Sequence, residues 1–327
     1  MPALEHRTVE TNRIRMHFVE QGEGPLVVLC HGFPESWYSY RRQIPALAEA
    51  GFRVVAPDQR GYGQTDKPQD VGAYNLFQLT GDIVGLVDAL GADEAVIVGH
   101  DWGAPVAWMS CLLRPDIFRA VALLSVPFLA NFGRGPRPSD AISHRLGDQF
   151  EFYQNYFQEP GRAEAEFERD VRKSLRMFFF SASGDPRPEQ RWRFIFPKNE
   201  TFLQQCVDPA ALPAWLTDAD VDFFTGEFER SGFRGGLNWY RNIDFSWENT
   251  GFLNGAKLRQ PALFVAGEHD AVLQMYPEAV RDLEQNVPNL RKKVIISGAG
   301  HWIQQERPAE VNQLLLEFLN DLQGPVR

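Results

Sequence analysis

Short apolar runs bounded by turn residues are the feature that most constrains how this chain can fold. Six of them recur along the sequence, at residues 26–30, 53–56, 95–98, 120–124, 262–266 and 293–296. Within each run the apolar residues are consecutive rather than alternating, as is typical of strands that are buried on both faces. Segments with helical periodicity lie between the runs, at 38–50, 76–90, 105–113, 277–284 and 308–322. This succession predicts an α/β fold built on a doubly wound, mostly parallel sheet.

Alternating polar and apolar residues precede the first of these runs. They occupy residues 8–10 and 14–18, on either side of Thr11 and Asn12. Such alternation is typical of strands with one buried face. We expect an antiparallel hairpin at the edge of the sheet.

The succession of strands and helices is interrupted in the middle of the chain. Buried-strand runs are absent between residues 129 and 255, where aromatic, charged and helix-compatible sequence takes over. With 327 residues, the chain is longer than one such core needs. We therefore predict a core formed by residues 1–128 and 256–327, with a helical cap inserted at 129–255. Within the insertion, an amphipathic stretch at 162–180 has a polar face around Glu164 and Glu168 that we expect to be solvated.

The charge balance and the cysteine content exclude several functional classes. Acidic residues outnumber basic ones, 43 to 33, and the net charge of −10 argues against a nucleic-acid or anionic-membrane surface. The three cysteines are odd in number and far apart, so they predict neither a disulfide framework nor a zinc site. We expect no signal peptide and no membrane span, because no apolar stretch is long enough. The expectation is a cytoplasmic protein without a metal or cofactor.

A candidate nucleophile lies in the pentapeptide GHDWG, residues 99–103, directly after the third apolar run. This is the pattern of a nucleophile elbow, with Asp101 in place of the usual serine. A sharp turn from strand to helix strains its central residue, and flanking glycines allow the chains to pack closely. The turn would hold the carboxylate at the carboxyl end of the sheet, beside a helix N-terminus. The alternative is that Asp101 only caps the helix.

Two partners for Asp101 follow later strands of the predicted sheet. Asp270 comes shortly after the fifth apolar run, and His301 comes shortly after the sixth. Because the carboxyl ends of parallel strands meet at one edge of a sheet, we expect the three side chains to converge there. The fourth run is followed by Ser125, so that strand offers no carboxylate. We therefore assign nucleophile, acid and base to Asp101, Asp270 and His301.

A further element follows the first apolar run. The tetrapeptide HGFP, residues 31–34, stands where α/β hydrolases with the elbow pattern place a loop that helps to form an oxyanion hole. The two donors would be the backbone N–H groups of Phe33 and Trp102. Three neighbouring histidines are expected to support these loops rather than to react, namely His31, His100 and His269.

An aspartate nucleophile narrows the range of reactions. A carboxylate attacks amides and esters weakly, but it can displace a good leaving group or open a strained ring, which leaves an alkyl ester on Asp101. His301, oriented by Asp270, can then deprotonate a water that hydrolyses the ester. Alkyl halides and epoxides are the substrate classes that fit. A halide needs neutral N–H donors, whereas an epoxide oxygen becomes an alkoxide and needs an acid.

A family resemblance distinguishes these two substrate classes. The chain resembles the soluble epoxide hydrolases over nearly its whole length, through HGFPESWYSYRRQ, APDQRGYGQTDKP, GHDWGAPVAW, FYQNYFQEPG, GFRGGLNWYRN and GHWIQQERPAEVN. In that family two cap tyrosines hold the epoxide oxygen and protonate the alkoxide. The resemblance assigns these roles to Tyr153 and Tyr240, with Tyr156 as a rival for the first. It implies a small apolar epoxide and water as partners.

Two alternatives are kept beside this prediction. A haloalkane or haloacid dehalogenase of the same superfamily would share the nucleophile. Haloalkane dehalogenases usually carry Asn where this chain has Phe33, however, and fluoroacetate dehalogenases typically carry Arg where it has Trp102. A non-catalytic receptor with the hydrolase fold often lacks a member of the triad, and none is missing here. The sequence leaves the physiological epoxide, the enantioselectivity and the formation of a homodimer undecided.

Overall fold

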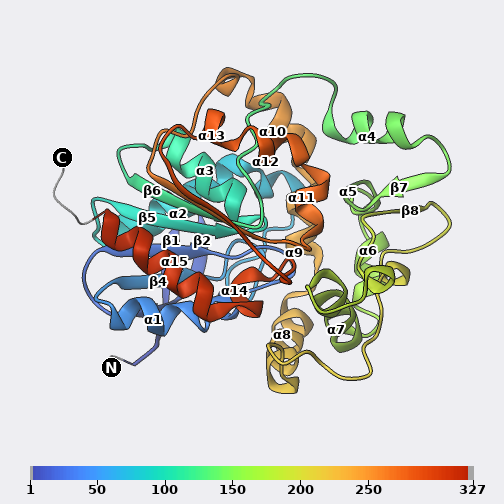
Figure 1. Cartoon of the computed structure of the whole chain (residues 1–327), viewed down its shortest axis with the longest axis horizontal. Helices are drawn as coiled ribbons and strands as arrows, with labels where there is room; N and C mark the ends of the chain where they lie inside the picture. The colour runs from blue at the N-terminus through green and yellow to red at the C-terminus, as the bar shows by residue number, and fades with distance from the viewer. Residues whose placement is uncertain (1–2, 323–327) are drawn as a thin grey trace.

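An eight-stranded sheet forms the centre of the computed structural model, which describes residues 3–322 (Figure 1). In sheet order the strands are β1 Glu5–Thr11, β2 Ile14–Gln21, β4 Arg53–Pro57, β3 Leu26–Cys30, β5 Ala95–His100, β6 Phe118–Leu124, β9 Ala262–Gly267 and β10 Leu290–Ile296. β2 pairs antiparallel with β1 and with β4, and the other neighbouring strands are parallel. The predicted α/β fold is therefore confirmed, and so is the hairpin at the edge of the sheet.

Helices cover both faces of this sheet (Figure 1). The main ones are α1 Gln43–Glu49 and α15 Pro308–Asp321 on one face, and α2 Leu76–Ala89 and α3 Gly103–Leu113 on the other. Along β3, Leu29 belongs to the same hydrophobic cluster as Leu47 of α1, whereas Val28 belongs to the cluster of Ile83 of α2. Because successive side chains point to opposite covered faces, both must be apolar. This burial explains the continuous apolar runs.

The chain between β6 and β9 lies beside the sheet rather than in it (Figure 1). Its helices are α4 Pro138–Leu146, α5 Tyr153–Tyr156, α6 Arg162–Phe167, α7 Val171–Ala182, α8 Asp218–Ser231, α9 Arg234–Arg241 and α10 Ile243–Asn249. Its two short strands, β7 Phe150–Phe152 and β8 Ile195–Pro197, pair only with each other. The inserted helical segment agrees with the predicted fold class. The boundaries at residues 129 and 255 stay a prediction.

The remaining helices are short and connect the larger elements. Four of them are α-helical, α11 Ala271–Met275, α12 Pro277–Arg281, α13 Leu283–Asn286 and α14 Ile303–Glu306. Five are 3₁₀ helices, η1 Trp37–Tyr40, η2 Val71–Tyr74, η3 Pro188–Gln190, η4 Leu203–Gln205 and η5 Gly251–Leu253. The helix predicted at 277–284 is thus divided into α12 and α13.

Two other predicted helices are also divided, each for a local reason. The segment at 38–50 forms η1 followed by α1. Because α1 begins at residue 43, Pro45 lies in its first turn, where proline is tolerated. The stretch at 162–180 forms α6 and then α7. The Asp170 side chain starts α7 by accepting a hydrogen bond from the backbone N–H of Lys173.

Two expectations about burial are wrong. Glu164 is buried rather than solvated, and it forms an ion pair with Arg241, with 2.7 Å between Oε1 and Nη1. Burial would raise the pKa of this carboxyl, but the hydrogen bonds and the charge of Arg241 lower it. The last apolar run lies in β10, which is an edge strand and leaves Ile295 41% exposed. An edge strand has a neighbour on one side only, so its faces are covered incompletely.

The three cysteines are buried and free, in agreement with the expectation that they form no disulfide. Among residues 3–322, no helix combines the length and the apolar character that crossing a membrane requires. In the same part of the chain, no group of three or more His, Cys, Asp or Glu side chains is arranged to hold a metal ion.

Candidate active site

Asp101 stands at the turn from β5 to α3. Its φ of +48° lies in the left-handed region, where residues with a Cβ are strained. A Cβ on Gly99 would lie 2.1 Å from the carbonyl oxygen of Gly103, and one on Gly103 would lie 2.0 Å from that of Cys30. The turn therefore needs both glycines. Trp102, not Asp101, is the N-cap residue of α3, and no side-chain cap hydrogen bond is formed there, so the capping alternative is wrong.

Asp101, His301 and Asp270 come together at the carboxyl edge of the sheet. His301 Nδ1 lies 3.1 Å from Asp270 Oδ1, and His301 Nε2 lies 3.5 Å from Asp101 Oδ2. Asp270 is fully buried and also accepts a hydrogen bond from the backbone N–H of Val272 at the start of α11. The imidazole thus lies between two carboxylates, as the order of the strands led us to expect.

The charges of this group depend on one another. Burial would lower the pKa of His301, but the charge of Asp270 and the hydrogen bonds to both carboxylates raise it well above its usual value. Burial would likewise raise the pKa of Asp270, whereas the charge of His301 and its hydrogen bond lower it. The two carboxylates therefore favour the protonated form of His301 over the neutral form.

The loop that follows β3 contacts Asp101 Oδ1, the carboxylate oxygen that does not face His301. The backbone N–H of Phe33 donates a hydrogen bond to Asp101 Oδ1 over 2.8 Å. A Cβ on Gly32 would lie 2.3 Å from the same oxygen, so only glycine allows the loop to approach this closely. The two predicted donors therefore lie on either side of Asp101. Phe33 is joined to it by this hydrogen bond, and Trp102 is the next residue in the chain.

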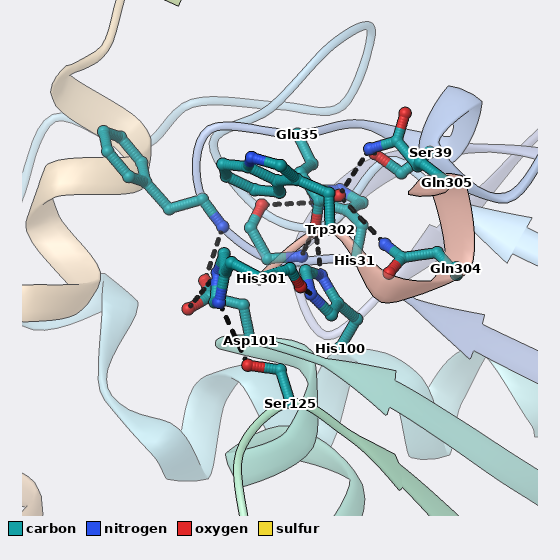
Figure 2. A network of polar contacts seen from close by, with 12 residues as sticks. His31, Glu35, Ser39, His100, Asp101, Ser125, His301, Trp302, Gln304 and Gln305 are labelled. Carbon is teal, nitrogen blue, oxygen red and sulfur yellow. Dashed lines mark hydrogen bonds and ion pairs between the residues drawn. The ribbon is translucent and has the colours of Figure 1, made fainter. Parts of the chain in front are cut away.

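A buried polar network lies behind the triad (Figure 2). Glu35 Oε2 lies 2.7 Å from His100 Nδ1, and His100 Nε2 lies 2.7 Å from the carbonyl oxygen of His301. A carboxylate and a carbonyl both accept, so both ring nitrogens of His100 face hydrogen-bond acceptors. Glu35 also accepts from the backbone N–H of Gly32 and from the side chains of Gln304 and Gln305. This network links the loop that follows β3 to the loop that carries His301.

Burial would raise the pKa of Glu35, but the charge of His100 and the hydrogen bonds lower it from 4.5 to about 2. Its stabilising contribution is thus present above pH 4.5 and is lost as the pH falls toward 2. We expect Glu35→Gln to destabilise the protein by about 3 kcal/mol at pH 7, because it leaves a buried charge without its partner. The measurement is urea unfolding followed by circular dichroism.

The pH dependence of the lost stability distinguishes the Glu35–His100 ion pair from an effect of packing alone. At pH 3 the loss caused by Glu35→Gln is expected to shrink by roughly 2 kcal/mol, since the wild type has then lost most of the same contribution. The exposed Glu284 provides a matched control, because Glu284→Gln removes a carboxylate of the same type from the surface. A loss that is equal at pH 7 and pH 3 would contradict the ion pair.

His301 also contacts Ser125, a residue without a sequence motif of its own. Ser125 Oγ lies 3.0 Å from His301 Nδ1, and the residue has a φ of +72° directly after β6 (Figure 2). Nδ1 therefore faces both Asp270 and Ser125. The two contacts fix the orientation of the ring.

The other two histidines that were predicted to support the loops lie outside the triad. His31 Nδ1 contacts the carbonyl oxygen of Gly32, and its Nε2 accepts from the backbone N–H of Gln59. His269 is half-buried and is tied through its backbone N–H to the carbonyl oxygen of Ala299. Both therefore brace turns near the site.

Three tyrosines were candidates for the acid, and the charge of Asp101 acts on two of them. Tyr153 and Tyr240 are buried, with ring centroids 5.8 Å apart. Burial raises the pKa of both phenols, and the negative charge of Asp101 raises it further. Tyr156 instead donates its hydroxyl to Glu166 and packs under the guanidinium of Arg162. It is therefore excluded as the rival acid.

Comparisons with known proteins agree with this geometry. The family model described as the alpha/beta hydrolase fold matches residues 25–308. The chain is 47% identical to Epoxide hydrolase A of Mycobacterium tuberculosis, with 99% of each chain covered. It is 43% identical to Epoxide hydrolase 2 of Siraitia grosvenorii, with 98% of this chain and 99% of the other covered. An epoxide hydrolase from an endophytic Streptomyces superposes with a TM-score of 0.94 at 49% identity, covering 98% of this chain and 96% of the other.

Proposed function

Since the chain belongs to the α/β hydrolase family and, within it, to the epoxide hydrolases, we propose that it converts epoxides to vicinal diols through a covalent ester on Asp101. The position of the Asp101 carboxylate supports this most directly. One of its oxygens accepts from Phe33 N–H and the other lies near His301. The carboxylate is thus held where a nucleophile needs to be, and a base for the second step is beside it.

Ring opening begins at Asp101 Oδ2, the oxygen that is not held by the backbone. Oδ2 forms a bond to an epoxide carbon while the bond from that carbon to the epoxide oxygen breaks. The electron pair goes to the epoxide oxygen, which takes a proton from Tyr153 or Tyr240. Oδ1 becomes the ester carbonyl oxygen and stays within reach of Phe33 N–H.

Ester formation prepares His301 for the second step. Alkylation removes the negative charge of Asp101, which is one of the groups that raise the pKa of the imidazole. The pKa of His301 therefore falls, and the ring releases a proton and becomes a base. Asp270 stays ionised and keeps the ring in place.

Hydrolysis then returns the enzyme to its starting state. His301 takes a proton from water, and the oxygen of that water attacks the carbonyl carbon of Asp101. The oxyanion on Oδ1 is stabilised by the N–H groups of Phe33 and Trp102. When the tetrahedral intermediate collapses, the bond to the substrate oxygen breaks, and the diol leaves with a proton from His301. The phenolate left by ring opening takes the proton that His301 released when the ester formed, and Asp101, left as a carboxylic acid, passes its proton to His301.

The same proposal gives the inserted segment its role. Residues 129–255 form a cap that carries Tyr153 and Tyr240 to the carboxyl edge of the sheet. The buried aromatic side chains around the two phenols suit a small apolar epoxide. A cytoplasmic location fits three buried, unpaired cysteines.

A single turnover in ¹⁸O water tests the covalent route. With enzyme in excess over epoxide, the heavy oxygen is expected in the Asp101 carboxylate rather than in the diol, because water attacks the ester carbonyl. Mass spectrometry of the peptide that contains Asp101 measures the label, and the peptide with Asp270 is the internal control. Heavy oxygen found in the diol after the first turnover would contradict the ester and favour direct attack by water.

A further inference from the structure

Each of the two phenols has a neighbouring N–H donor directed at its oxygen. Gln154 Nε2 donates to the hydroxyl oxygen of Tyr153 over 3.1 Å. Tyr240 forms a hydrogen bond with the side chain of Trp102, whose ring lies perpendicular to the phenol with centroids 5.1 Å apart. Indole has only a donor, so Trp102 Nε1–H donates and the phenol oxygen accepts. The two phenols come from different helices, yet they have the same type of partner.

An N–H donor has two consequences for a phenol that acts as an acid. A hydroxyl carries one hydrogen, and when its oxygen accepts a bond, that hydrogen stays free for another acceptor. The same donor stabilises the phenolate that remains after proton transfer, so it acts against the burial and the Asp101 charge that raise the pKa of both tyrosines. The donors therefore favour proton transfer in the direction that ring opening needs.

Gln154 is held through both its side chain and its backbone. The phenol of Tyr276, which lies between α11 and α12, shares a hydrogen bond with the Gln154 side chain. Gln158 Nε2 donates to the backbone carbonyl oxygens of Gln154 and Tyr240. The donor of one phenol is thus tied to the sheet domain and to the helix that carries the other phenol.

We propose that Gln154 and Trp102 are positioning residues that orient the Tyr153 and Tyr240 hydroxyl hydrogens toward the epoxide oxygen and stabilise the phenolates left behind. This inference rests on the proposed function, in which these two phenols are the acids. Trp102 contributes its indole here, in addition to the backbone N–H assigned to the oxyanion hole.

The test uses variants in which one phenol is left. In the Tyr240→Phe background, Gln154→Met keeps the length of the side chain and removes its N–H groups. We expect ring opening of 1,2-epoxypropane, measured in a single turnover, to slow about tenfold, as the loss of one hydrogen bond implies. The slowing is expected to be smaller for 3,3,3-trifluoro-1,2-epoxypropane, because its alkoxide is less basic and depends less on the acid.

Controls separate this tuning from damage to the structure. Gln158→Met in the same background removes a neighbouring amide, which donates to the backbone carbonyl oxygens of Gln154 and Tyr240 rather than to a phenol. It should slow ring opening of both epoxides equally. Trp102→Phe in the Tyr153→Phe background should repeat the unequal effect on the other phenol. If Gln154→Met does not fold, Gln154→Glu is the second variant, and the same inequality is expected because its carboxylate donates no N–H.

The outcomes distinguish the inference from the function on which it rests. Equal slowing of the two epoxides by Gln154→Met and by Trp102→Phe would overturn the inference and leave the proposed acids intact. Ring opening that persists when both phenols are removed would overturn the proposed function itself. Unequal slowing in both backgrounds supports the two positioning roles.

Discussion

His301→Gln is expected to stop the enzyme after ring opening, with the substrate bound to Asp101 as an ester. Ring opening uses Asp101 and the phenols, and the variant keeps all three, together with the N–H of Phe33 on Oδ1. Ester hydrolysis loses its base, and a general base typically contributes about 10²- to 10⁴-fold. We therefore expect steady-state turnover to fall by about 10³-fold or more, with one equivalent of epoxide consumed.

Intact-protein mass spectrometry measures this result directly. After addition of excess epoxide, the variant should be heavier by the mass of one substrate molecule, and peptide mapping should place the addition on Asp101. His144 lies on the surface, so His144→Gln is a control that should leave the protein free of adduct and active. An unmodified His301→Gln protein that still produces diol would show that the base is another group.

The second large effect is expected from the double variant Tyr153→Phe with Tyr240→Phe. Both phenols lie in a buried, aromatic environment, where an unprotonated alkoxide is a very poor leaving group. Each single variant keeps one acid and should retain part of the activity. The double variant should lose ring opening by about 10³-fold or more, because general acid catalysis is then absent.

Combination with His301→Gln shows which step is lost. A triple variant without either phenol should form no adduct on Asp101, whereas His301→Gln alone should be fully modified. Tyr156→Phe is the matched control, since its hydroxyl contacts Glu166 rather than the nucleophile. A dehalogenase needs no acid for its leaving group, so an undiminished rate in the double variant, or halide release from alkyl halides, would favour that alternative.

The triad could be predicted from the sequence because it depends on strand order. Asp101, Asp270 and His301 each follow an apolar run, and parallel strands end at the same edge of a sheet. The pentapeptide around Asp101 also predicted the strained turn, which the φ of +48° confirms. These features are local, or they follow from topology alone.

Contacts between distant side chains could not be predicted in this way. Glu35 precedes Gln304 by 269 residues, and their hydrogen bond exists only because the oxyanion loop and α14 meet beneath the site. Glu164 was expected in solvent because helical periodicity says nothing about Arg241 on another helix. Ser125 and Gln154 show no motif of their own, since their positions depend on the groups that they contact.

By itself, the sequence determined the class of fold and the strand ends at which Asp101, Asp270 and His301 lie, because burial on two faces and a strand-to-helix turn each leave a local pattern. Only the tertiary structure decided which tyrosine faces Asp101 and which one turns to Glu166. It also decided the direction in which the pKa of His301 shifts, because the ring lies between two carboxylates that raise it. Electrostatic effects depend on distance in space, and that distance is set by packing rather than by position along the chain.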